Sequence, residues 1–379
     1  MNIVRIGIIT LHRVVNYGSA LQAYALQEYI EENGLGEVEI IDYYFPNKFH
    51  KRKLSFMKWL RKMYCVEIRD MYFRGKRKKM QSLESFYDKY YHLSSCSYHS
   101  VRQIMENPPL YDLYMTGSDQ LWNVNTMRND PVMYCEFAPE DKRRVSFGAS
   151  FTNRELPQQF KETVRARLNK YSYIGVREVS SLDIVNDLKI KPNIVVENTC
   201  DPTLLLKAED YDKLAIQSRL TIDGDYILVY ALQYSYSPEP ALSTIVKQAK
   251  NKLGCGVVVV DYYKIKLLDG DRIINGIGPC EFCWLFKHAK FVIANSFHAV
   301  MFSIIYRRPF VGIGPDKKKE DRRINDILEL MGLRKNFVNA DDSDIDTCIN
   351  SPFTSAVEER LNCFIENSKA YLCRAIFNQ

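Results

Sequence analysis

His298 lies in Ala294-Asn295-Ser296-Phe297-His298, at the junction of two apolar runs. The run before it, residues 291–294, is typical of a buried strand, and the run after it, residues 300–305, is typical of a helix. An unperturbed histidine titrates at about pH 6.5, so it can act as a general acid or a general base near neutral pH. The competing interpretation is a core histidine that only hydrogen-bonds a neighbour.

Other polar stretches also follow expected strands. Ser118-Asp119-Gln120 comes directly after a strand expected at residues 110–116, and Asn16-Tyr17-Gly18 follows one expected at residues 3–9. Residues 276–282 open a helix whose free backbone N–H groups can hold an anion. Open parallel sheets bind ligands beyond the carboxyl ends of their strands, so these junctions are expected to carry a site. The alternatives are that Asp119 caps its own turn and that Gly18 serves only a tight turn.

The alternation of strands and helices predicts an α/β protein with two Rossmann-like α/β/α domains facing a cleft. The N-terminal domain is expected over residues 1–206, the C-terminal domain over 207–350, and a helical segment that packs across a domain over 351–379. In the first domain we expect strands at 3–9, 38–42, 110–116, 144–149, 174–177 and 194–196, with helices at 21–30, 157–171 and 179–189. In the second we expect strands at 226–231, 256–261, 291–294 and 310–313, with helices at 237–253, 280–289, 298–306 and 322–331.

Residues 48–92 interrupt this alternation with a basic, helical excursion. Its first part, residues 48–62, contains no acid, and apolar side chains recur among the cations at helical spacing. Residues 48–64 therefore fit either an interfacial helix on an anionic membrane or a solvated helix that covers a core. The stretch lacks a recognition-helix, zinc-finger or RNP-type pattern, so we expect no nucleic-acid partner.

The composition is that of a globular protein, since 46% of the 379 residues are apolar and 26% are charged, with a formal net charge of +6. No stretch approaches the roughly 18 apolar residues of a membrane span, and the first residues lack a signal-peptide pattern. Cys280 and Cys283 form one CxxC, without the second pair that a structural zinc site usually needs. We expect a cytoplasmic protein, at most peripheral at the inner face of the membrane, with no metal site.

Seven stretches taken together resemble the polysaccharide pyruvyl transferase family. In order they are NYGSALQAYAL, TGSDQLWN, SFGAS, GVRE, DPTLLL, GPCEF, and ANSFHAVMFSII with RRPFVGI. Each is short, but seven in the family's order are specific, and they span most of the chain. The resemblance implies a fold similar to the GT-B glycosyltransferases. It also implies transfer of a pyruvyl group from phosphoenolpyruvate to a sugar of a surface polysaccharide or its precursor, forming a pyruvate ketal without a cofactor.

The resemblance assigns roles to residues. His298 corresponds to the family's motif histidine and is expected as the acid or base, with Asp119 as a second catalytic group. The donor carries a carboxylate and a phosphate, which need cations or helix N-termini. The residues expected to bind the donor are Arg177, Arg322, Arg323, Asn295, Ser296 and Gly278. Those expected to bind the saccharide acceptor, which is free or lipid-linked, are Asn16, Tyr17, Gly18, Ser118 and Gln120.

Simpler interpretations stand beside some of these roles. For Arg177 the alternative is a surface ion pair, and for Arg323 a solvated helix start. Asp201-Pro202-Thr203 is interpreted as a structural turn, and Glu281 as a favourable first-turn acid without a catalytic role.

One position departs from the pattern of many family members. They carry an arginine two residues before the histidine, whereas Ser296 stands here, as in another branch of the family. One anion ligand is therefore missing, so either another cation replaces it or the donor differs. Two other functions stay open. One is a GT-B glycosyltransferase that uses a nucleotide sugar, with the diphosphate at Gly278, and the other is a non-catalytic member of a polysaccharide-assembly complex.

Overall fold

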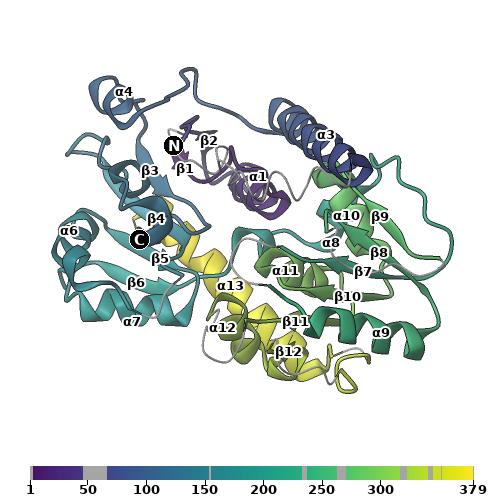
Figure 1. Ribbon diagram of the computed structural model, residues 1–379. Helices are drawn as coiled ribbons and strands as arrows, with labels where there is room; N and C mark the ends of the chain where they lie inside the picture. Colours follow the sequence, from purple (N-terminus) through teal and green to yellow (C-terminus); the bar gives the residue numbers. More distant parts are fainter. Residues whose placement is uncertain are drawn as a thin grey trace.

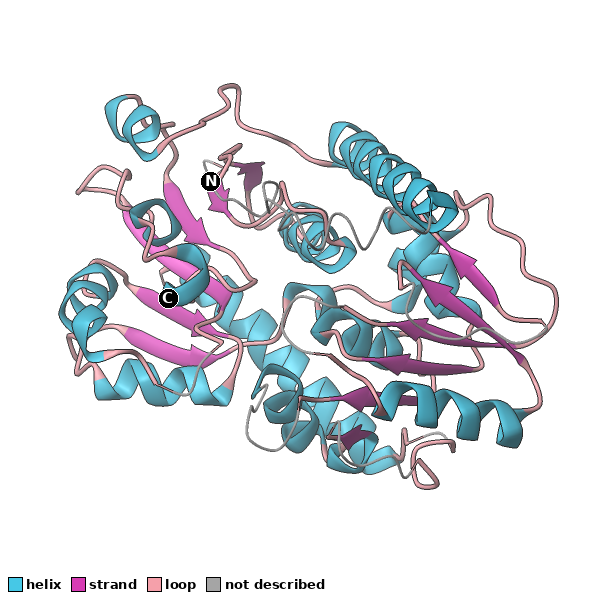
Figure 2. Cartoon of the chain, in the orientation of Figure 1, coloured by secondary structure: helices cyan, strands magenta, loops and turns pink. Residues whose placement is uncertain are grey.

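The computed structural model describes residues 3–45, 66–152, 155–232, 237–262, 270–315, 322–339, 345–350 and 352–378. For residues 66–73 and Arg322 it describes the backbone only, and the predicted membrane segment at 48–64 lies outside the described residues. Two six-stranded parallel sheets, each with its own helices, form the two halves of the molecule (Figures 1 and 2). This arrangement confirms the predicted α/β fold class.

The first sheet has the strand order β2-β1-β3-β4-β5-β6. Its strands are β1 (Arg5–Ile9), β2 (Glu37–Ile40), β3 (Leu113–Thr116), β4 (Arg143–Ala149), β5 (Tyr173–Val176) and β6 (Val195–Asn198). The helices of this half are α1 (Tyr17–Glu32), α3 (Val66–Tyr90), α4 (Val101–Glu106), α5 (Val124–Met127), α6 (Gln158–Leu168) and α7 (Val179–Asp187), with the short 3-10 helices η2 (Pro131–Tyr134) and η3 (Pro202–Leu204).

The second sheet has the order β12-β11-β10-β7-β8-β9. Its strands are β7 (Tyr226–Tyr230), β8 (Gly256–Val260), β9 (Arg272–Ile274), β10 (Phe291–Ala294), β11 (Phe310–Ile313) and β12 (Phe337–Val338). The remaining helices are α8 (Ala208–Ala215), α9 (Ala241–Leu253), α10 (Pro279–His288), α11 (Phe297–Ile305), α12 (Arg322–Met331), the 3-10 helix η4 (Arg334–Asn336) and α13 (Ser355–Phe377).

The central strands β7 and β10 are apolar along their whole length and fully buried, as expected for parallel strands that are covered on both faces. The expected strands and helices are present, with ends that differ by a few residues. The sequence analysis missed α4, α5, α8, β9 and β12. The strands β9 and β12 have three and two residues, so neither is long enough to show a pattern. The predicted domain boundary after residue 206 falls between η3 and α8.

Helix α1 lies between the two halves. Its residues from Tyr17 to Gln27 are all buried, and it packs on η3 in the first half and on α10 and α11 in the second. One apolar cluster runs from Ile6 in the first sheet, through α1, to Phe282 and Phe302 in α10 and α11. The halves therefore share a core, and the loops at the carboxyl ends of both sheets meet around the start of α1.

Two long helices also link the halves. Helix α13 follows the second sheet in the chain but returns to the first (Figure 1). There the Tyr371 hydroxyl donates to the carbonyl of Ser146 in β4. Helix α3 lies beside α1 and α10, and Lys79 forms an ion pair of 2.8 Å with Asp261 at the end of β8. A Cβ added at Gly276 would lie 2.8 Å from the carbonyl oxygen of Gly75, which shows how closely α3 approaches the loop before α10.

Candidate active site

His298 is the second residue of α11 and is 6% exposed. Its Nε2 lies 3.5 Å from Oδ2 of Asp201, which is long for a hydrogen bond, and has no closer partner among the described residues. Gly18 packs against the other side of the ring, since a Cβ there would lie 2.2 Å from Cγ and 2.3 Å from Nδ1. The His298 imidazole, which belongs to the second half, is thus held between Asp201 and Gly18 of the first half.

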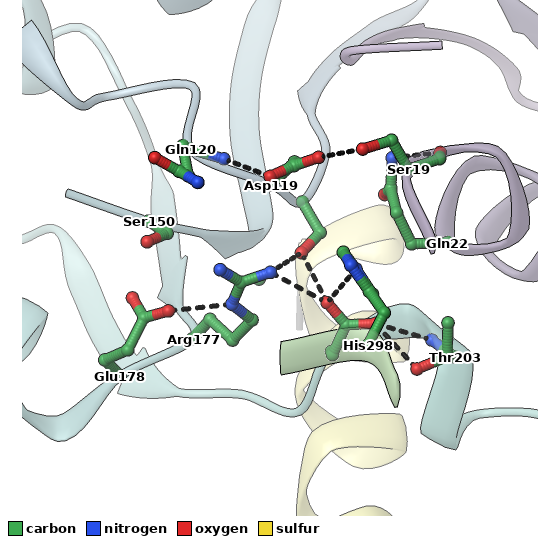
Figure 3. A network of polar contacts seen from close by, with 12 residues as sticks. Ser19, Gln22, Asp119, Gln120, Ser150, Arg177, Glu178, Thr203 and His298 are labelled. Carbon is green, nitrogen blue, oxygen red and sulfur yellow. Dashed lines mark hydrogen bonds and ion pairs between the residues drawn. The ribbon is translucent and has the colours of Figure 1, made fainter. Parts of the chain in front are cut away.

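Asp201 is the centre of the site. Its Oδ2 accepts hydrogen bonds from Arg177 Nη1 at 2.9 Å and Ser118 Oγ at 3.0 Å, and it also faces His298. Its Oδ1 accepts from the backbone N–H and the hydroxyl of Thr203, at 3.1 and 2.7 Å. Figure 3 shows Arg177, Thr203 and His298 converging from different elements. We call these five residues the Asp201 network.

The environment of Asp201 favours its charged form. Burial alone would raise the pKa of this carboxyl, but the charges of His298 and Arg177 and the hydrogen bond from Thr203 outweigh it. The pKa of Asp201 is therefore held well below its usual range. A carboxylate that is charged near neutral pH is a partner that can orient an imidazole and stabilise its protonated form.

The interpretation of Asp201 as a structural turn was incomplete. The side chain does cap η3, as the sequence indicated, but it also contacts three residues that were assigned to the site. A signal was available, because Asp201 lies just beyond β6 at the carboxyl edge of the sheet, where the other candidates were found. Its match to a common turn pattern hid this position.

Arg177 forms ion pairs with two carboxylates. Besides Asp201, it donates from Nε to Glu178 Oε1 at 2.8 Å, and its guanidinium lies 4.1 Å from the centre of the Phe297 ring. Burial alone would lower the pKa of Arg177, but the charges of Glu178, Asp201 and Asp119 raise it. The alternative of an ion pair with a nearby acid is therefore confirmed, but its surface location is wrong, because the Arg177 side chain is 3% exposed. The ion pairs are buried, and two acids already compensate the cation.

Asp119 connects the end of β3 to the start of α1. Its Oδ2 accepts from Ser19 Oγ at 2.5 Å, and its Oδ1 accepts from the backbone N–H of Gln120 at 2.8 Å (Figure 3). The backbone of Asp119 has φ +80°, a left-handed conformation that costs free energy for a residue with a side chain. Both hydrogen bonds hold it in place, and the carboxylate keeps lone pairs that can accept from a sugar hydroxyl.

Asn16 caps the start of α1, and the residues that follow it make contacts in different directions. Asn16 Oδ1 accepts from the backbone N–H groups of Gly18 and Ser19, at 2.9 and 3.3 Å, as an N-cap does. This cap places Gly18 against His298 and Ser19 against Asp119. Tyr17 points away from the Asp201 network, and its hydroxyl donates to Asp261 Oδ2 at 2.7 Å.

Other expected binding residues lie in different contacts. The amide of Asn295 donates to and accepts from the backbone of Leu232, at 2.8 and 2.6 Å. Gln120 accepts from the amide of Asn123 at 3.2 Å. The backbone N–H of Gly278 donates to the Glu281 carboxylate, which therefore occupies the start of α10.

Helix α12 carries the two remaining arginines. Arg323 is half-buried, and one turn further Asp326 accepts a hydrogen bond from the backbone N–H of Ser180 in α7 at 3.0 Å. This bond attaches the start of α12 to the first half. The side chain of Arg322 lies outside the described residues.

The number of acidic and basic side chains in the site limits which charged ligands can bind there. Asp119, Glu178 and Asp201 bring three carboxylates against the guanidinium of Arg177 and the titratable His298. The hydroxyl of Ser296 makes no capping hydrogen bond to the first turn of α11, and the residues of that turn are buried. His298 therefore places a proton donor or acceptor one residue inside a helix N-terminus, the end of a helix that favours an anion.

Within the described ranges, no group of three or more His, Cys, Asp or Glu side chains is placed to hold a metal ion. A helix long and apolar enough to cross a membrane is also absent from the described part of the chain.

Comparisons with known proteins agree with the fold and identify a family. A family model described as polysaccharide pyruvyl transferase matches residues 16–317. A search of curated proteins gave no match. Among solved structures, UDP-GlcNAc 2-epimerase from Methanocaldococcus jannaschii, in complex with UDP-GlcNAc and UDP, is similar with a TM-score of 0.53 and 12% identity, over 96% of this chain and 99% of that one. Arabidopsis thaliana UGT89C1, complexed with UDP-L-rhamnose, is similar with a TM-score of 0.51 and 11% identity, over 100% of this chain and 99% of that one. At these identities the likeness shows a GT-B-like fold and nothing about the ligand.

Proposed function

The chain belongs to the polysaccharide pyruvyl transferase family, and we propose that it transfers a pyruvyl group from phosphoenolpyruvate to a saccharide, forming a pyruvate ketal. The observation that carries this proposal is the position of His298. An imidazole stands at the start of α11, with a carboxylate behind it whose pKa lies well below its usual range. This combination suits a donor that needs both an anion site and a proton.

The proposed reaction starts with a proton from the His298 imidazolium to the methylene carbon of phosphoenolpyruvate. An acceptor hydroxyl adds to the neighbouring carbon and gives up its proton, and inorganic phosphate leaves from that carbon. A second hydroxyl of the same sugar then adds, loses its proton and closes the ketal. The atoms balance as phosphoenolpyruvate plus a sugar diol giving a ketal plus phosphate.

The donor and the acceptor would bind to different halves. The first turn of α11, with Ser296, would hold the donor's carboxylate or phosphate, and Arg322 and Arg323 of α12 are the proposed cations. Arg177 is a weaker candidate than the sequence suggested, because two carboxylates already compensate it. Asp119 is the proposed base for the acceptor, and its bond to Ser19 would orient it toward a sugar hydroxyl.

The experiment is a product assay that does not assume an acceptor. Phosphate release from phosphoenolpyruvate is measured against a panel of galactosides, glucosides and N-acetylmannosaminides, and each product is weighed by mass spectrometry. In D2O the new methyl group should carry one deuterium, because the first step protonates the methylene carbon. Phosphate release without a ketal product, or turnover that His298→Ala leaves intact, would contradict the proposal.

We also propose that the acceptor is met at an anionic membrane surface. Helix α3 exposes Arg74, Lys76, Arg77 and Lys78 within two turns. The ion pair of Lys79 with Asp261 and the close approach of Gly75 to Gly276 hold these cations on the body of the protein. Clustered lysine and arginine side chains attract anionic headgroups by about 1 kcal/mol each. A membrane bound to these cations would then bring a lipid-linked saccharide close to the boundary between the two halves.

A further inference from the structure

We infer that Asp201 is a positioning residue that orients His298 across the boundary between the two halves, so that the acid–base chemistry depends on the contact between them. The catalytic role of His298 rests on the proposed function. The contacts of its ring and the position of the ring proton do not depend on which reaction is catalysed.

The first half fixes Asp201 without help from His298. Ser118 follows β3, Arg177 follows β5, and both bind Oδ2 of Asp201. Thr203 binds Oδ1, and the preceding backbone N–H, that of Cys200, donates to Ser368 of α13 at 2.9 Å. The carboxylate is therefore in place before any residue of the second sheet approaches it.

His298 belongs to the second half, where its ring meets the Phe297 ring edge-on with the centroids 5.3 Å apart. It follows β10, and its Nε2 is fully buried without a hydrogen-bond partner among the described residues, the Asp201 oxygen lying 3.5 Å away. Gly18, on the opposite side of the ring, also belongs to the first half. A separation of a few ångströms would remove both contacts, because both come from the same side of the boundary.

The geometry also assigns the two ring nitrogens. The Asp201 carboxylate accepts hydrogen bonds and cannot donate them, so it favours a proton on Nε2 of the neutral ring. Nδ1 is then the nitrogen that accepts or delivers the proton of the reaction. The charged groups around the ring are Asp201, with Arg177 behind it, and Asp119 across the start of α1.

A second set of contacts keeps the halves together beside this pair. Tyr17 directly precedes Gly18, and its hydroxyl donates to Asp261 of the second half. Lys79 pairs with the same Asp261 oxygen at 2.8 Å and lies 3.8 Å from the centre of the Tyr17 ring. Loss of these contacts should disturb His298 although none of them touches it.

The experiment records 15N resonances of protein labelled at histidine, with the His298 signals assigned from their loss in His298→Gln. We expect a neutral Nε2–H tautomer in the wild type and a mixture of tautomers in Asp201→Asn, whose side-chain amide can also donate. Asp201→Glu should restore part of the wild-type pattern. Lys79→Met should move the His298 signals in the same direction as Asp201→Asn.

The matched control is Asp42→Asn. Asp42 is another buried aspartate of the first sheet with a histidine and an arginine as partners, since it binds His12 at 3.0 Å and Arg13 at 2.8 Å. This control should leave the His298 signals unchanged while costing comparable stability. If Asp201→Asn does not fold, Gly18→Ala makes the test, because its Cβ displaces the ring from the opposite side.

The outcomes separate this inference from the proposed function. Wild-type signals in Asp201→Asn, or the same shift in Asp42→Asn, would overturn the positioning role whatever the enzyme transfers. If the tautomer changes as expected but phosphoenolpyruvate is not a substrate, the pairing stands and only the proposed reaction fails.

Discussion

Gly18 and His298 touch across the boundary between the two halves, so closely that a Cβ on Gly18 would fall 2.2 Å from the imidazole Cγ. Glycine therefore serves a close approach at this position, because Gly18 lies within α1 and has no positive φ. Gly18, for which a tight turn was the alternative, therefore helps to determine where the candidate acid–base residue lies.

The first prediction concerns Gly18→Ala. Alanine suits a helix better than glycine by about 1 kcal/mol, so the backbone should tolerate the change. The added methyl must instead move His298 or separate the halves, and we expect turnover to fall at least tenfold. The measurement is kcat together with the melting temperature. Gly34→Ala is a contrast, since a Cβ there meets no atom within 4 Å and only its positive φ resists the change. Full activity in Gly18→Ala would contradict the packing described here.

The second prediction concerns stability against pH. The folded-state pKa of Asp201 lies below its ordinary value, so its contribution is fully present above about pH 4 and is lost as pH falls through the folded pKa. Asp201→Asn should cost roughly 3–5 kcal/mol near neutral pH, because it leaves Arg177 partly unpaired in the interior. The difference in the free energy of unfolding between Asp201→Asn and wild type should become smaller below about pH 4. Urea unfolding at several pH values measures this difference, and a difference that does not change with pH would contradict the lowered pKa of Asp201.

The third prediction contrasts two arginines. Arg177→Ala should mainly destabilise the protein, because it strands the buried carboxylates of Glu178 and Asp201. Arg323→Ala should leave the melting temperature within a few degrees and raise KM for phosphoenolpyruvate by about tenfold, as loss of a charge-assisted contact does. Steady-state kinetics and thermal unfolding separate the two effects. If Arg177→Ala instead raised KM without lowering the melting temperature, Arg177 would be assigned to the donor site.

The fourth prediction concerns α3 and membranes. Changing Arg74, Lys76, Arg77 and Lys78 together to Glu should abolish flotation with vesicles containing phosphatidylglycerol and leave flotation with neutral vesicles unchanged. The control changes four exposed cations elsewhere in the first half, Arg165, Lys170, Lys189 and Lys191, to Glu and so alters the net charge equally. Retained binding by the α3 variant, or equal loss in the control, would argue against this surface.

Sequence patterns predicted the architecture well because the elements that define it are long or strongly apolar. The runs at Phe291–Ala294 and Tyr226–Tyr230 are short, continuous and apolar, which favours buried strands, and the rule for the carboxyl ends of strands led to His298 and Ser118. Both residues meet on Asp201 in the structure.

Contacts between residues far apart in the sequence could not be predicted in the same way. Arg177 and Asp201 are 24 residues apart, whereas Tyr17 and Asp261 are 244 apart, and no local pattern specifies contacts at such separations. The sequence analysis therefore did not foresee that Arg177 pairs with Asp201, and it assigned Asp201 only a turn.

The central claim is that His298 transfers a proton to phosphoenolpyruvate, and titration calorimetry with phosphoenolpyruvate, UDP and GDP tests it most directly. For wild type we predict binding of phosphoenolpyruvate and no binding of either nucleotide. For His298→Ala we predict a dissociation constant for phosphoenolpyruvate within about threefold of wild type, together with loss of turnover. Binding of a nucleotide alone would contradict the account and indicate glycosyl transfer on this fold.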